Sequence, residues 1–468
     1  MLSTSRQTKS RSGCQPCKRR RVKCDEAKPT CNRCMRRGET CTGNFDADTW
    51  QIERPWLYTL EPVSSRSEPK LPQTFTVSRT LNYAPGNDVL RHWFDHACLT
   101  MAIVPPPMNP LSYPISPYLH RSKAARHAIQ CISQAHLHHF STSQVVRVLE
   151  ERHLALVALQ HEIERVSRST QPFYLRTILL SSLLLGISSS WVTPGDWGGE
   201  FLIGARHVVG LIIEQHSQRD PRDACLQYIL GLYVWWEAVS SFITPRASLL
   251  NPLSRIKPVS WILQTVVDRY LISEVHPVTG IASSLFPVLA EVGAYYRLTV
   301  NTLSRDPATE TALEARLLEW SPSIPRPDLL DKRWWSLWTL AQSYQAMGII
   351  MLQQARSVIA ELTLEQQQTV DDKVGSIMAM LRTVPLSDPL VNSEAPLLLV
   401  AGSELPADQP ELRDLVARHV QQLTDYTRVT AFSSVFSLVQ DVWRDRDNEG
   451  RITWLELMVF QGIHLSLA

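Results

Sequence analysis

The sequence lacks any hydrophobic run long enough to cross a membrane. Its most apolar stretch, ILLSSLLLGI at 178–187, falls well short of the roughly 20 residues that a membrane-spanning helix needs. The first residues, MLSTSRQTKSRSG, carry charges but no apolar segment of the kind found in a secretory signal. We therefore expect an intracellular, soluble protein that keeps its thiols reduced and has no membrane partner.

Glycine is scarce, and recognisable catalytic motifs are missing. The 468 residues include 18 glycines, and there is no G-x-S-x-G motif, no phosphate-binding glycine-rich loop and no Rossmann fingerprint. The segment HEIER at 161–165 lacks the second histidine of a zinc protease. These absences predict that the protein is not an enzyme.

Cysteine is almost absent outside one short region. Only Cys98, Cys131 and Cys225 lie beyond residue 41, and no histidine occurs before His92. The other six cysteines form C-x2-C-x6-C, then six residues, then the same unit again: Cys14, Cys17, Cys24, Cys31, Cys34 and Cys41. Thiolates at this spacing favour zinc, because iron–sulfur clusters normally use four cysteines in other spacings.

The number of cysteines limits how the metal is held. A structural zinc takes four thiolate or imidazole ligands. Two separate zinc ions would need eight ligands, and this region offers six cysteines and no histidine. The duplicated unit therefore predicts two zinc ions per chain, with two sulfurs shared between them.

Positive charge is concentrated in the same region. Residues 1–41 contain twelve Lys or Arg and three acidic residues, so they carry +9, and the rest of this +2 chain carries −7. Six thiolates and two zinc ions contribute about −2, which leaves a strongly basic head suited to phosphate. The basic run could instead serve only as a nuclear localisation signal. Because residues 1–41 lack Phe, Tyr and Trp, on which RNA readers stack bases, double-stranded DNA is the favoured partner.

Residues 14–41 resemble the fungal binuclear zinc cluster (Zn2Cys6) transcription factors without a gap. Pro29 stands where that family usually has a loop proline, although the basic stretch Lys18–Lys23 departs from its pattern at the first and fourth places. The resemblance implies that Cys14 and Cys31 bridge the two ions. It also implies a nuclear protein that reads CGG triplets in the major groove and regulates transcription by RNA polymerase II.

The same resemblance assigns roles to the basic side chains. Arg20 and Arg21 are the candidates for the base edge, because a bidentate contact to guanine O6 and N7 is the commonest specific base contact. The remaining basic residues are assigned to phosphates: Lys18, Arg19, Lys23, Arg33, Arg36 and Arg37. Sequence alone does not separate these two roles.

The chain changes character after Cys41. Prolines at 55, 62, 69 and 72 exclude a long helix, so we expect a linker over 42–87 without the dimerising coiled coil of many relatives. Helical periodicity then dominates 88–468, in particular over 142–168, 172–189, 200–216, 223–243, 330–360 and 409–443. The expected architecture is a small metal-stabilised Zn2Cys6 domain at 14–41 followed by a large all-α domain at 88–468.

The expected helical domain resembles the regulatory region that accompanies these clusters, the fungal-specific transcription factor domain. The resemblance is carried by LLLGISSSW at 183–191, EFLIGARHVVGLI at 200–212, and the terminal Val442, Trp443 and Trp454. These stretches are short, so the assignment depends on the cysteine motif that precedes them. It implies a body that regulates activity and contacts partners.

Three features of the body could bind a ligand, and ordinary packing is the favoured interpretation of each. Asp445–Glu456 has the spacing of a calcium-binding loop but no second loop to pair with. Histidines cluster at 92, 96, 136, 138 and 139 without acidic or cysteine partners at fixed spacing. The pairs Trp235–Trp236 and Trp334–Trp335 would mark the pocket if a small-molecule effector exists.

The sequence therefore predicts a nuclear, sequence-specific DNA-binding transcription factor. Its partners would be double-stranded DNA, a second copy or transcriptional co-regulators, and an effector of the helical domain. The alternatives are a protein or RNA interaction module, or a metal-dependent enzyme, that carries a zinc-binding head. A zinc content of one ion per chain would favour those alternatives.

Overall fold

The computed structural model describes two compact units, Met1–Ala84 and Pro85–Ala468, which are considered separately. The described residues are 14–20, 22–25, 31–39, 41, 88–138, 145–166, 172–193, 195–215, 223–243, 257–271, 275–328, 331–429 and 431–467. Across these ranges the chain is helical and forms no β-strand, as the sequence predicts. The linker expected at 42–87 lies outside the described residues and stays a prediction.

The N-terminal unit contains two short helices, α1 (Gln15–Arg19) and α2 (Asn32–Met35), which pack against each other. Each begins directly after a cysteine, Cys14 or Cys31, so the sequence duplication is repeated in the backbone. The buried interior of this unit consists of cysteine side chains. Among the described residues of this unit, no other hydrophobic core is present.

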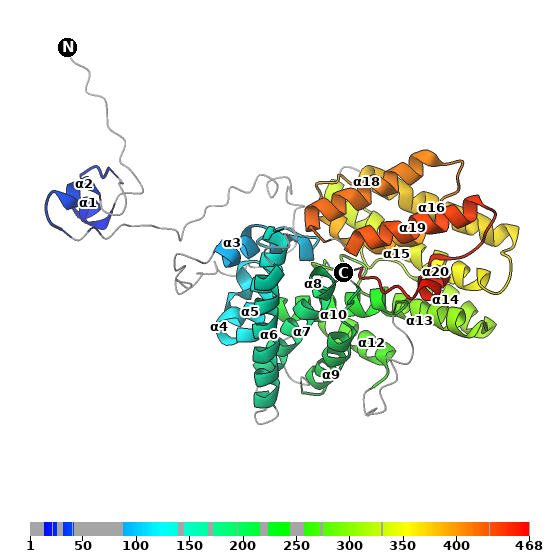
Figure 1. The fold of residues 1–468 in the computed structure, drawn as a ribbon, viewed down its shortest axis with the longest axis horizontal. Helices are drawn as coiled ribbons and strands as arrows, with labels where there is room; N and C mark the ends of the chain where they lie inside the picture. Colours follow the sequence, from blue (N-terminus) through cyan, green and yellow to red (C-terminus); the bar gives the residue numbers. More distant parts are fainter. Residues whose placement is uncertain are drawn as a thin grey trace, which may run out of the picture. The chain divides into compact units, whose positions relative to one another are not determined.

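The C-terminal unit, called the body below, begins with a group of packed helices (Figure 1). In chain order these are α3 (Asp88–Asp95), η2 (Ala97–Met101), η3 (Tyr113–Ile115), α4 (Ser116–Arg121), α5 (Lys123–His138), α6 (Val145–Val166), α7 (Pro172–Ile187), α8 (Ser189–Val192), α9 (Gly199–Gln215), α10 (Ala224–Ser240) and α12 (Val259–Tyr270). Helix α5 packs on α6 and α7, and α7 packs on α9.

The second half of the body forms another group, drawn in green to red in Figure 1. Its helices are α13 (Phe286–Thr302), α14 (Pro307–Glu319), α15 (Lys332–Ser357), α16 (Leu364–Thr383), η4 (Pro389–Ser393), α17 (Ala395–Gly402), α18 (Pro410–Thr427), α19 (Ala431–Asp447) and α20 (Trp454–Gln461). Side chains cap several starts: Asp306 accepts from Ala308 and Thr309 at α14, and Thr363 with Gln366 forms a capping box at α16.

Helices α10 and α17 lie at the centre of the body. Residues 226–240 of α10 and every residue of α17 are buried, which is expected of helices that are apolar on all sides. Helix α10 packs on α7, α12 and α13, so it joins the two halves of the body. This continuity makes the body one folding unit.

The periodic stretches in the sequence correspond to helices α6, α7, α9, α10 and α15 within a few residues. The pattern at 409–443 differs, because it divides into α18 and α19. Arg428 adopts a left-handed conformation with φ of 57° and ends α18, which a hydrophobic pattern alone does not reveal. Among the described helices, none is long and apolar enough to cross a membrane.

Candidate functional site

The six cysteines predicted as metal ligands come together in the N-terminal unit. Their sulfur atoms form two groups of four, and within each group all lie within 4.8 Å of one another. One group is Cys14, Cys17, Cys24 and Cys31, and the other is Cys14, Cys31, Cys34 and Cys41. Cys14 and Cys31 belong to both groups, which matches the sharing that the sequence resemblance implies.

The sulfur spacings fit tetrahedral zinc. Cys14 Sγ lies 3.6 Å from both Cys31 Sγ and Cys34 Sγ, and Cys17 Sγ lies 3.8 Å from Cys31 Sγ. Four sulfurs about 2.3 Å from one zinc ion are separated by roughly 3.8 Å. All six side chains are at least partly buried, so the thiol groups face one another and not solvent. The donor set is therefore suited to zinc.

The environment of the thiols shows why a cation is needed here. Burial raises the pKa of Cys34 to about 12 and raises the pKa values of Cys14 and Cys17 as well. Backbone N–H groups act in the opposite direction: the amide of Cys34 lowers the pKa of Cys31, and the amide of Cys31 lowers that of Cys41. Two bound divalent cations would supply the positive charge that lets the thiols ionise.

The basic residues surround this sulfur cluster, and most of those described face solvent. Lys23 and Arg19 of the first half are exposed, as are three arginines of the second half: Arg33, Arg36 and Arg37. Arg21 and the side chain of Lys18 lie outside the described residues, so the roles assigned to them stay predictions. The exposed set is suited to phosphate contacts.

Arg20, which the resemblance assigns to a base edge, contacts residues of its own unit, and the base-edge role stays a prediction. Its guanidinium donates to Glu39 at 2.8 and 3.0 Å and to Cys34 Sγ at 3.7 Å, and its Nε donates to the Pro16 carbonyl. The side chain is 25% exposed. Arg20 therefore ties the first half of the unit to the second half, which is a structural role.

Sequence reasoning overlooked two acidic residues of this unit. Glu39 is the partner of Arg20, and Asp25 accepts a 3.0 Å hydrogen bond from the backbone N–H of Asn32 at the start of α2. Although desolvation opposes it, that bond keeps the pKa of Asp25 below its usual value. The sequence does contain a signal for these two residues, because acidic side chains are rare in so basic a segment.

The calcium-binding interpretation of Asp445–Glu456 is not supported by the geometry. Asp445 and Asp447 lie within α19, and Asp447 pairs with Arg413 at 2.7 Å. Glu456 forms a capping box with Thr453 at the start of α20. The segment is a helix-to-helix connection, as the favoured interpretation expected, and the carboxylates of Asp445, Asp447 and Glu456 already have partners.

Three of the clustered histidines of the body pack against one another. His92 and His136 lie with Nε2 and Nδ1 2.9 Å apart, and the ring of His96 is 4.9 Å from that of His92. Burial, together with neighbouring histidines and Arg428, lowers the pKa of both His92 and His136 to about 4. These groups are neutral at physiological pH. Among the described residues, the only clusters with metal-ligand geometry are the two cysteine groups.

Trp235 lines a cavity of about 50 Å³, whereas Trp236 is buried in the core. The lining is mostly apolar and includes Trp191, Leu232 and Phe432. The indole N–H of Trp191 is buried without a hydrogen-bond partner among the described residues. One member of the predicted tryptophan pairs is thus beside a cavity, although the space is small.

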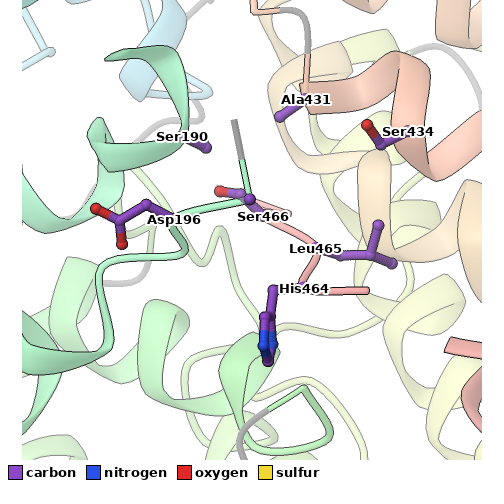
Figure 2. Close-up of a pocket in the computed structure, with 8 residues that line it drawn as sticks. Ser190, Asp196, Ala431, Ser434, His464, Leu465 and Ser466 are labelled. Carbon is purple, nitrogen blue, oxygen red and sulfur yellow. The ribbon is translucent and has the colours of Figure 1, made fainter. Parts of the chain in front are cut away.

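A second cavity, of about 40 Å³, lies between α8, the start of α19 and the C-terminal residues (Figure 2). Ser190, Asp196 and His464 line it, and these residue types also occur in hydrolase triads. Figure 2 shows that the carboxylate of Asp196 and the ring of His464 point away from each other. Asp196 accepts from the backbone N–H of Gly198, so no nucleophile and base are paired here.

Comparison with known proteins matches both units. Residues 12–51 match the Fungal Zn(2)-Cys(6) binuclear cluster domain, and residues 88–468 match the Fungal specific transcription factor domain. No solved structure is significantly similar to the chain.

Three curated relatives match the N-terminal unit. The Zn(2)-C6 fungal-type transcription factor afumD of Aspergillus fumigatus is 61% identical over 44 residues, which cover 9% of this chain and 12% of the relative. The lysine biosynthesis regulatory protein LYS14 of Saccharomyces cerevisiae is 54% identical over 39 residues, 8% of this chain and 5% of the relative. White-opaque regulator 2 of Candida albicans is 50% identical over 38 residues, 8% of each chain.

The matched stretches thus span a small fraction of the relatives' own length, whereas the helical domain match covers most of this chain. A zinc cluster followed by this helical domain accounts for both units of the structure. The chain therefore belongs to the fungal Zn(2)-Cys(6) transcription factors that carry a fungal-specific transcription factor domain.

Proposed function

We propose that this protein is a nuclear transcription factor that binds CGG-containing DNA through its zinc cluster and regulates genes read by RNA polymerase II. The observation that carries the proposal is the pair of overlapping four-cysteine groups surrounded by exposed basic side chains. One zinc ion would be held by the first group and a second by the other group. Bound zinc would supply the folding energy of the unit and hold α1 and α2 in place for contact with DNA.

Base reading is assigned to Arg21 and phosphate contact to Lys18, Arg19, Lys23, Arg33, Arg36 and Arg37. The ion pair between Arg20 and Glu39 favours this division, since a guanidinium held by Glu39 is not free to contact a base edge as well. A bidentate arginine contact discriminates against the wrong base by about 1 to 3 kcal/mol. Phosphate contacts add affinity without discrimination and weaken as salt rises.

The test compares full-length wild type and Arg21→Ala by fluorescence anisotropy on CGG-containing and scrambled duplexes at several salt concentrations. The variant is expected to lose about tenfold or more on the CGG duplex and much less on the scrambled one. Arg444→Ala, at an exposed site on α19, is the control, because removing one charge from the body should change neither. Equal loss on both duplexes would refute base reading, and preference for single-stranded RNA would refute the DNA assignment.

We further propose that the body receives a small-molecule signal at the cavity beside Trp191 and Trp235. This space is no larger than the volume of a few water molecules, so an effector would have to widen it. Leu232→Phe fills the cavity and should hold reporter expression at one level across growth conditions while DNA affinity in vitro is unchanged. Expression that still varies with conditions would place the signal elsewhere.

A further inference from the structure

The outer face of helix α6 carries an unusual number of exposed apolar side chains. Six of its side chains expose between 39 and 62% of their surface: Val146, Leu149, Leu154, Leu156, Val157 and Ile163. In a surface helix this face is normally polar. The helix has 22 residues and is about 33 Å long, and Figure 1 shows it standing along the edge of the body. Such a long exposed apolar stripe indicates a docking surface.

The opposite face of α6 fixes this orientation. Glu162 is buried and accepts hydrogen bonds from Ser122 Oγ and the backbone N–H of Ala124. Arg152 donates to the Leu185 carbonyl and to Ser189 Oγ. Because these polar groups anchor the helix to α5, α7 and α8, rotation cannot turn the apolar stripe inward.

Four of the six exposed apolar residues, together with His153 and Gln160, have the spacing of a coiled-coil seam. Steps of three and four residues alternate along the whole helix: Val146, Leu149, His153, Leu156, Gln160 and Ile163. All six of these side chains are exposed. This period matches a second α-helix lying along the first. A membrane or a small ligand would not require it.

We propose that α6 pairs with α6 of a second copy of this chain in antiparallel orientation. A twofold axis near residues 154 and 155 places Val146 against Ile163 of the second copy. The same axis places His153 against Leu156 and Gln160 against Leu149. Every seam pair then contains at least one apolar side chain, whereas parallel pairing would set His153 against His153 and Gln160 against Gln160.

The flanking residues are complementary in the same register. Arg147 lies beside Glu164 of the second copy, and Glu150 lies beside His161. Between these two polar contacts, Leu154 meets Val157, which accounts for the exposure of these two apolar residues outside the seam. Each contact occurs twice because of the twofold axis. The match of charge and apolarity selects a second copy over an unrelated helix.

This inference concerns the body and does not depend on what the zinc cluster reads. A dimer formed through α6 would join two zinc clusters in one complex without a coiled coil after residue 41. Two clusters on one complex bind paired DNA sites more tightly than either alone.

The test is sedimentation equilibrium of the full-length protein at micromolar concentrations. Wild type is expected to be a dimer, and Leu149→Glu combined with Leu156→Glu should weaken dimerisation about a hundredfold or more. Leu364→Glu is the matched control, since Leu364 is 92% exposed on α16 and should leave the dimer intact. A monomeric wild type, or a dimer equally weakened by the control, would overturn the proposal.

Charge reversal tests the partner and the orientation. Arg147→Glu places two acids together and should weaken the dimer, and so should Glu164→Arg. An equimolar mixture of these two variants allows a mixed dimer in which both contacts again join opposite charges, so the mixture should dimerise like wild type. The double variant Arg147→Glu with Glu164→Arg also restores both contacts and should dimerise like wild type. A double variant weaker than either single variant would exclude the antiparallel register. Unchanged melting temperatures would show that each variant remains folded.

Discussion

Cys14 Sγ and Cys31 Sγ lie 3.6 Å apart although the residues are 17 positions apart in the sequence. Both sulfurs belong to both four-cysteine groups, whereas each other cysteine belongs to one. The two halves of the duplicated motif therefore meet at these two atoms. This arrangement makes the consequences of substitution differ from one cysteine to another.

We predict that Cys14→Ser and Cys24→Ser differ in zinc content. Wild type should contain two zinc ions per chain by elemental mass spectrometry. Cys14→Ser removes a ligand from both groups and should lose both ions, while Cys24→Ser leaves Cys14, Cys31, Cys34 and Cys41 intact and should keep one. Cys225→Ser, in the body, is the control and should keep two. Equal losses in the two variants would contradict the shared position of Cys14.

Arg20→Ala should weaken the N-terminal unit without changing base preference. The substitution removes the contacts to Glu39 and Cys34 that join its two halves. Because the ion pair is partly exposed, we expect zinc release to a chelator to become about two- to fivefold faster. Affinity for CGG-containing and scrambled DNA should fall in parallel. Arg19→Ala, at an exposed position on α1, should release zinc at the wild-type rate, and a selective loss on CGG DNA in Arg20→Ala would restore the base-reading role.

The sequence was sufficient for the grouping of the six cysteines and for the helical body, because both depend on regular spacing. Cysteine positions and apolar periodicity are local signals that folding preserves. The pairing of Arg20 with Glu39 was not predictable, because it depends on where the second half of the unit returns in space. The end of α18 at Arg428 was missed for a related reason, since its left-handed backbone is stabilised by tertiary contacts, including hydrogen bonds to the carbonyls of His136 and Leu137.

Gly231→Ala should destabilise the body by about 3 kcal/mol. A Cβ atom at this position in α10 would lie 2.2 Å from ring atoms of His276. That ring cannot easily move, since His276 Nδ1 accepts from the backbone N–H groups of Val278 and Thr279, and Nε2 bonds to the Gln227 carbonyl. Urea unfolding followed by tryptophan fluorescence reports mainly on the body, because all of the tryptophans except Trp50 and Trp56 lie in residues 88–468.

The matched control is Gly210→Ala in α9. No atom lies within 4 Å of the added Cβ at this position. Replacing a helical glycine by alanine should then stabilise the body by about 0.5 to 1 kcal/mol. The two substitutions are chemically identical. Changes of opposite sign in the free energy of unfolding would therefore isolate the effect of packing against His276. Two similar effects would mean that helix propensity decides both.

The stability of the body should fall as pH decreases from about 6.5 to 4. Burial holds the pKa values of His92, His136 and His276 at about 4 in the folded protein, well below the usual 6.5. The unfolded chain therefore binds more protons than the folded body in this window, and the free energy of unfolding decreases as the pH is lowered. For His136, the nearby His92 and Arg428 add repulsion to the cost of burial.

His136→Gln should reduce the proton uptake on unfolding by about one proton between pH 4.5 and 6. His207→Gln, at an exposed position on α9, should leave it unchanged. Urea unfolding at a series of pH values measures both, and a wild-type slope that the His136 substitution does not alter would show that other groups govern the pH dependence.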